Sequence, residues 1–176
     1  MKQKSDLEEQ IRNTLIQLYR NDFDIIERGV HEQCISAHFW YYFKREYEEY
    51  YTGLNIDIEY NKNGENLKCI AKGKSARPDM IIHKRGINKQ NLLCVEFKKS
   101  EKEAEKDYEK LKKFTSELNG KEQYTYRYKY GVSVVITDDM QPSITWFENG
   151  KQEIPKKLDL RGDIGETKKI SDKESM

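Results

Sequence analysis

The chain has 176 residues, 36% of them hydrophobic and 36% charged, with a formal net charge of +1. This length suits a single domain, and no run approaches the roughly 18 apolar residues that a membrane span needs, which argues against a membrane protein. Three widely spaced cysteines in apolar surroundings, and an N-terminal segment without an apolar stretch, lead us to expect a cytoplasmic protein with reduced thiols.

The first part of the chain is predicted to be helical. Apolar residues recur every three or four positions over residues 6–20, which predicts a first helix. The same spacing predicts a second helix over residues 24–50, and Gly29 leaves its beginning open. Glu32 lies three residues before Ile35, so we expect it on the inward face of that second helix.

The middle of the chain changes to strand patterns. Alternation of apolar and polar residues over 56–60 predicts a strand. Short apolar runs at 80–82 and 92–97, separated by a polar turn segment, predict an antiparallel hairpin. Ser100 and Glu103 form a capping box that begins a third helix.

The last part of the chain is predicted to hold a buried strand at 130–137 and an edge hairpin at 144–154. Residues 156–176 are charged and poor in apolar side chains, so we expect a disordered tail there and a single domain over residues 1–155. Helices followed by strands, a helix and further strands pack most simply as an α/β fold, with a mixed sheet flanked by helices.

The balanced net charge conceals a basic segment. Residues 68–99 contain nine basic side chains and only two acidic ones, Asp79 and Glu96, which gives the segment a charge of +7. A local excess of positive charge around two carboxylates is typical of a site that attracts phosphates and holds a metal. The alternative interpretation is a solvated loop with solubilising lysines.

The residues with the clearest chemical meaning are Asp79, Glu96 and Lys98. Glu96 and Lys98 are two residues apart in a predicted strand, so they project from one face, and Asp79 begins the neighbouring strand. Two carboxylates brought close together raise each other's pKa, and a divalent cation removes that conflict. Mg²⁺ (or Mn²⁺) commonly binds through one or two carboxylates plus substrate phosphate, and a nearby ammonium can position the attacking water.

The pattern Pro78-Asp79, sixteen residues, then Glu96-Phe97-Lys98 resembles the signature of the PD-(D/E)XK, or restriction-endonuclease-like, nuclease superfamily. The resemblance covers roughly residues 25–147. Within the superfamily, the chain is similar to small stand-alone members that are mostly uncharacterised. The stretches that carry it are Glu59–Asn61, Arg77–Gly86 and Asn91–Ser100. Lys62 stands where an arginine is expected, which keeps the charge but loses bidentate phosphate geometry.

The resemblance implies metal-dependent hydrolysis of phosphodiester bonds on a restriction-endonuclease-like mixed β-sheet flanked by α-helices. By position, it makes Asp79, Glu96 and the main-chain carbonyl of Phe97 the ligands of Mg²⁺ (or Mn²⁺). Lys98 would orient or activate the attacking water. Glu32 matches the helical glutamate that many members add to the site.

Further roles are expected around these residues. Glu27 is the fallback for the helical glutamate, and Glu59 either supports the metal ligands from behind or faces solvent on its strand. For Asp107 and Lys110 the expectation is a solvated helix face, because the third helix is charged along its length. Four basic residues are expected to contact phosphate or nucleic acid: Arg77, Lys84, Arg85 and Lys99.

The function predicted from the sequence is therefore a metal-dependent nuclease that acts on nucleic acid, on DNA rather than RNA. A domain of this size carries one active site, so cutting both strands needs a homodimer or two events. The alternative is a catalytically dormant nuclease-fold subunit that binds nucleic acid or serves in assembly.

Overall fold

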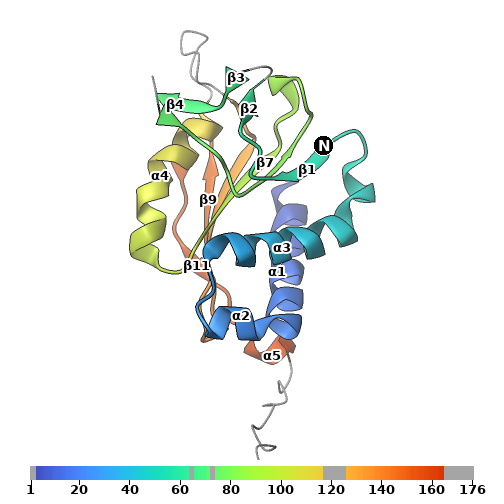
Figure 1. The fold of residues 1–176 in the computed structure, drawn as a ribbon, viewed down its shortest axis with the longest axis vertical. Coiled ribbons are helices and arrows are strands. Elements are labelled where there is room, and N and C mark those ends of the chain that lie inside the picture. The colour runs from blue at the N-terminus through green and yellow to red at the C-terminus, as the bar shows by residue number, and fades with distance from the viewer. Residues whose placement is uncertain (1–2, 64–65, 72–73, 117–125, 165–176) are drawn as a thin grey trace, which may run out of the picture.

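The structure is a computed structural model that describes residues 3–63, 66–71, 74–116 and 126–164. Its main feature is a seven-stranded mixed sheet with helices packed against it (Figure 1). The strand order is β1-β6-β7-β8-β9-β10, and β11 also pairs with β9. This is the α/β class with a mixed sheet flanked by helices that the sequence predicts.

The strands of the main sheet follow the predicted segments closely, except for β11, which lies in the segment expected to be a disordered tail. Their bounds are β1 Asn55–Ile58, β6 Met80–His83, β7 Leu93–Lys98, β8 Tyr130–Val135, β9 Ser143–Glu148, β10 Lys151–Gln152 and β11 Lys156–Lys157. Two further pairs of short strands connect β1 to β6. They are β2 Lys62–Asn63 with β3 Asn66–Leu67, and β4 Cys69–Ala71 with β5 Lys74–Ser75.

The register around β7 produces a fork at one end of the sheet. β6 and β7 are antiparallel, as predicted, and their ladder ends at the pair Met80 and Val95. The parallel ladder between β7 and β8 continues further, to the pair Lys98 and Val135. The last residues of β7 therefore extend past the start of β6, so side chains from neighbouring elements can approach them there.

Helices on the two faces of the sheet form two apolar cores. Helices α1 (Lys4–Asn21) and α3 (Glu32–Tyr47) cover one face, and α4 (Glu101–Thr115) covers the other. In β7, Val95 and Phe97 belong to the first core, whereas Cys94 belongs to the second. Because side chains alternate along a strand, Glu96 and Lys98 project toward α4.

The second predicted helix is in fact interrupted. The structure has α2 (Phe23–Glu27), α3 and a short 3-10 helix, η1 (Glu49–Tyr51), in place of one helix over residues 24–50. Gly29 adopts a φ of 63° between α2 and α3, a conformation that glycine reaches without strain. The His31 side chain then accepts the Gln33 N–H at 3.2 Å, so α3 begins at Glu32.

The expectation of a disordered tail from residue 156 onward is wrong for residues 156–164. Strand β11 pairs with β9, and α5 (Arg161–Ile164) packs near α1. Leu160 and Ile164 are buried and Leu158 packs against the same core, so three apolar residues hold a segment that is otherwise mostly charged. Residues 165–176 of the expected tail lie outside the described residues. Within the described ranges, no helix is long and apolar enough to cross a membrane.

Candidate active site

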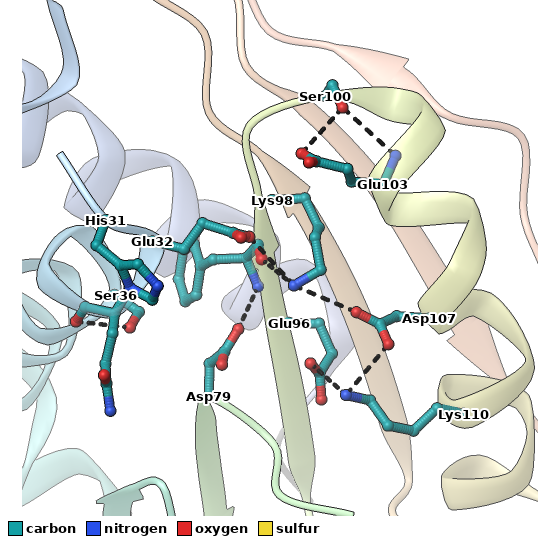
Figure 2. Close-up of polar contacts among 12 residues, drawn as sticks. His31, Glu32, Ser36, Asp79, Glu96, Lys98, Ser100, Glu103, Asp107 and Lys110 are labelled. Carbon is teal, nitrogen blue, oxygen red and sulfur yellow. Dashed lines mark hydrogen bonds and ion pairs between the residues drawn. The ribbon is translucent and has the colours of Figure 1, made fainter. Parts of the chain in front are cut away.

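Asp79 lies at the fork between β6 and β7, where its carboxylate takes over a backbone role. The Asp79 N–H donates to the Val95 carbonyl at 3.1 Å, which extends the β6–β7 ladder by one step. The Asp79 carbonyl accepts the Glu59 N–H instead of a β7 donor. The next N–H of β7, that of Phe97, therefore donates to the Asp79 carboxylate at 2.7 Å (Figure 2). This bond fixes the carboxylate at the end of the ladder.

Glu96 is a buried carboxylate with one unsatisfied oxygen. Its side chain is 2% exposed, and its Oε2 accepts a 2.6 Å hydrogen bond from Lys110. Its Oε1 is buried, and no described residue gives it a hydrogen bond. Burial raises the pKa of Glu96 to about 8; the Lys110 ammonium opposes this shift, and the nearby Asp79 carboxylate adds to it. The site therefore holds a carboxyl group that lacks a full set of partners.

Lys98 is enclosed by oxygens from three elements. Its ammonium lies 2.8 Å from the carbonyl of Phe97, 3.1 Å from Glu32 and 3.2 Å from Asp107 (Figure 2). Burial by itself would lower the pKa of Lys98, but the carboxylates of Asp107, Asp79 and Glu32 outweigh it and raise the pKa above its ordinary value. Lys98 is therefore protonated at neutral pH and acts as a hydrogen-bond donor.

The face of α4 that carries Asp107 and Lys110 is not the solvated face expected from the sequence. Asp107 bridges the ammonium groups of Lys98, at 3.2 Å, and Lys110, at 3.3 Å. The reason lies in the start of α4. The Ser100 hydroxyl accepts the Glu103 N–H at 3.4 Å, so the helix begins just after β7 and its second turn returns over the strand. Residues three positions apart then share the inward face.

Glu32 contacts Lys98 from α3, on the side of the fork opposite to α4. It is the first residue of α3, and its side chain, 32% exposed, pairs with Lys98. Ile35, one turn later, is 2% exposed, in keeping with the inward face expected for both residues. Glu27, the fallback for this role, belongs to α2 and has no contact with Lys98 among the described interactions.

Two of the four expected phosphate contacts lie at the wrong end of β6. Asp79 precedes this strand, whereas Lys84 and Arg85 follow it. The Arg85 Nε donates to Asp57 at 2.8 Å, and this partner lies on β1. Hydrogen bonds to His83 and Arg85 outweigh burial and hold the pKa of Asp57 well below its usual range. The structure therefore does not bring these two basic residues to the fork.

The other two expected contacts lie closer. Arg77 forms an ion pair with Glu59, and the backbone of Glu59 is bonded to Asp79. The Arg77 side chain is 55% exposed, so it can still meet an approaching phosphate. Lys99 follows Lys98, but its ammonium donates to the carbonyl of Gly29 at 2.7 Å. Lys99 thus points to the turn between α2 and α3.

The donor set fits a hard divalent cation held mainly by water. In the described part of the chain, no group of three or more histidine, cysteine, aspartate or glutamate side chains is placed to hold a metal ion. Glu32 and Asp107 pair with the Lys98 ammonium. Asp79 accepts a backbone N–H through Oδ2, and Glu96 pairs with Lys110 through Oε2, which leaves Oε1 of Glu96 without a partner among the described residues. Two carboxylates, one with a buried oxygen that lacks a partner, suit Mg²⁺, which keeps several waters and often uses one or two carboxylates.

Comparison with known proteins yields one structural similarity. No family model matches the chain, and no curated protein matches it. Among solved structures, it is similar to part of a chain in the cryo-EM structure of a DrdV–DNA complex, with a TM-score of 0.46 and 14% sequence identity. The alignment covers 85% of this chain and 12% of that chain, so this chain spans a small part of the length of the other.

Proposed function

We propose that this protein is a metal-dependent nuclease of the PD-(D/E)XK superfamily, with DNA as its substrate. The observation that carries the proposal is the buried oxygen of Glu96 that lacks a hydrogen-bond partner, near the Asp79 carboxylate and two residues before the protonated Lys98. Burial of an acid with an oxygen that lacks a partner lowers the stability of the fold. A cation held by Asp79 and Glu96 would supply the missing partner and offset that cost.

The residues proposed as metal ligands are Asp79 and Glu96, for Mg²⁺ (or Mn²⁺). The Phe97 carbonyl is the third proposed ligand, and it accepts a hydrogen bond from Lys98. When bound, the ion supplies charge that polarises the scissile phosphate and lowers the pKa of the attacking water. The bond from the Phe97 N–H to Asp79 keeps that carboxylate oriented, and Lys110 does the same for Glu96.

Lys98 and Glu32 are proposed to act on the water and the phosphate. Lys98 carries its proton, so it donates hydrogen bonds to a phosphate oxygen or to the water and stabilises developing negative charge. Its side chain is 19% exposed, which leaves a path for substrate. Glu32, which is more exposed and 3.1 Å from that ammonium, is the proposed acceptor of the proton that the water releases.

DNA is proposed as the substrate because the sequence resembles nucleases that act on DNA; the charge of +7 over residues 68–99 favours nucleic acid in general, and Arg85 and Lys99 of that segment pair away from the fork. Arg77, exposed beside Asp79, is the proposed phosphate contact outside the metal site. Cleavage of both strands then requires a homodimer or two successive events.

The test is cleavage of plasmid, single-stranded DNA and RNA by the purified chain with Mg²⁺ or Mn²⁺, and with EDTA. Asp79→Ala and Lys98→Ala should each lower the rate at least about 100-fold, because each removes a group that acts in the transition state. Lys151→Ala is the matched control, since Lys151 is exposed on β10 at the far edge of the sheet. Unchanged cleavage by both site variants would refute the proposal.

A second outcome distinguishes the dormant alternative. Wild type that binds DNA in a salt-dependent way, cleaves nothing under any metal condition, and binds equally well after Lys98→Ala would be a nucleic-acid-binding subunit on a nuclease fold.

A further inference from the structure

A cavity of about 250 Å³ lies next to the candidate active site. It is bounded by the turn between α2 and α3 and by the residues that follow β7 and β8. Its apolar lining consists of three isoleucines that are each less than a tenth exposed: Ile26, Ile35 and Ile136. Its charged lining consists of one lysine and two acids: Lys99, Glu27 and Asp138.

The cavity and the active site share their framework. The Ile136 N–H donates to the Lys98 carbonyl at 2.8 Å, and Lys99 follows directly after the end of β7. On α3, Ile35 lies one helical turn after Glu32, which itself contacts the Lys98 ammonium. The cavity thus adjoins the backbone of Lys98 and the first turn of α3, and the side chains of Lys98 and Glu32 belong to the candidate active site.

The lining of the cavity matches a nucleobase better than a phosphate. Three isoleucines offer an apolar wall for the flat face of a ring. Lys99 uses one hydrogen bond on the Gly29 carbonyl and has further N–H donors for ring nitrogen or carbonyl acceptors. Glu27 and Asp138 are acceptors for an exocyclic amino group, and their negative charge opposes a second phosphate.

The size of the cavity points to one base. Pockets for drug-sized ligands span roughly 300–1,000 Å³, so this cavity is suited to a smaller group. A base of duplex DNA can enter such a pocket only when it leaves the stack, as it does in enzymes that flip a nucleotide out of the helix.

We propose that this cavity receives the nucleobase adjacent to the scissile phosphate, with preference for a base that carries an exocyclic amino group. The proposal rests on the proposed nuclease function for the position of the phosphate. It adds a determinant of specificity that lies on α2, α3 and the segment after β8, apart from the metal ligands.

The test uses the full chain, without metal, labelled at the isoleucine δ1 methyl groups and titrated in an NMR experiment. The probes are dAMP, dCMP, dGMP, TMP, deoxyribose 5-phosphate and inorganic phosphate. We expect shifts of the Ile26, Ile35 and Ile136 methyls with the three amino-bearing nucleotides and weaker ones with TMP. The control is Ile87, which is 45% exposed and follows β6 at the other end of the sheet, and it should not move.

A matched pair of variants tests the two acids. Glu27→Gln combined with Asp138→Asn should weaken binding of the amino-bearing nucleotides at least fivefold, because two acceptors lose their charge. Glu148→Gln, a change of the same kind on β9, should leave the affinity unchanged. Equal affinity in the double variant would overturn the assignment of these acids and with it the preference for an amino group.

Two outcomes would overturn the cavity itself as a base site. One is the absence of shifts at its three isoleucines with every nucleotide. The other is equal shifts with deoxyribose 5-phosphate, which would mean that only the sugar phosphate binds. If the wild type cleaves DNA but shows either result, the base site is refuted while the nuclease stands. If nucleotides bind here and no DNA is cut, the proposed nuclease function is refuted.

Discussion

The ammonium of Lys110 donates a 2.6 Å hydrogen bond to the carboxylate of Glu96, fourteen residues earlier in the chain. Both side chains are largely buried, at 15% and 2% exposure. A buried carboxylate is tolerated in a core only when a partner compensates its charge, so Lys110 determines whether Glu96 can remain there as an anion. A helix residue that the sequence left on the surface thus controls the electrostatics of the candidate metal site.

Removal of Lys110 should therefore destabilise the fold through Glu96. Lys110→Met is expected to lower the free energy of unfolding by about 3 kcal/mol at pH 9, where it leaves an ionised buried acid without its partner, and by less at pH 6, where Glu96 holds its proton. The loss should grow as the pH rises above 8, where Glu96 must ionise. Urea unfolding at pH 6 and pH 9 measures both effects. The double variant Lys110→Met with Glu96→Gln should recover most of the loss; the same loss in both would show that Glu96 is not the cause.

Glu96 should also make the stability of the metal-free protein depend on pH. Its pKa is about 8 in the folded state, against an ordinary value of 4.5, so the folded state holds the proton more tightly than the unfolded state. The contribution of Glu96 is therefore fully present below pH 4.5 and is lost as the pH rises through 8. Between these limits, the stability of wild type relative to Glu96→Gln should fall, as measured by thermal unfolding in EDTA. A constant difference would contradict the raised pKa.

Asp57 should dominate the acid side of the stability profile. Its pKa is held below the ordinary 3.8, so its contribution is present above that value and is lost as the pH falls through the folded-state pKa. Asp57→Asn should cost about 1.5–3 kcal/mol at pH 7, because it weakens hydrogen bonds to charged groups. The difference from wild type should shrink below pH 4 in urea titrations. DNA cleavage should change little, since this cluster lies at the other end of β6.

Gly131 on β8 sets the distance between α4 and the sheet. A Cβ there would lie 3.0 Å from Thr115 Cγ2 and 3.3 Å from a Leu111 methyl, both on α4. Gly131→Ala should therefore destabilise the protein by about 1–3 kcal/mol, as overpacking does. Thr115→Ser removes the closest carbon and keeps the hydroxyl, so the double variant should recover part of the stability in thermal unfolding. If Thr115→Ser gives no recovery, the clash is not the cause.

Metal binding can be measured without substrate by titration calorimetry. Mg²⁺ or Mn²⁺ should bind wild type and Lys98→Ala, while Asp79→Asn should bind at least tenfold more weakly because it loses an anionic ligand. Affinity should rise with pH up to about 8 and one proton should be released below that pH, since Glu96 must ionise to serve as a ligand. Equal binding by Asp79→Asn would exclude that residue as a ligand.

The sequence by itself determined the architecture and much of the local geometry. Alternation and apolar runs located the β6–β7 hairpin and β8, because strand periodicity is a local property that survives in the folded state. The spacing of Glu96 and Lys98 placed them on one face of β7, and the Ser100 capping box located the start of α4. The roles of these residues in metal binding and catalysis stay predictions.

Only the tertiary structure decided which charges meet. Asp107 and Lys110 lie one helical turn before Leu111 and Phe114 of the buried face of α4, but the charges along this helix do not show which of them meet β7. Arg85 and Arg77 lie in one basic segment, yet β6 carries Arg85 away to Asp57. Residues 156–164 were expected from composition to be a disordered tail, but burial of Leu160 in the core holds them against the fold. Composition records how many charges a segment has, whereas register and helix direction determine their partners, and both depend on packing between residues that are distant in sequence.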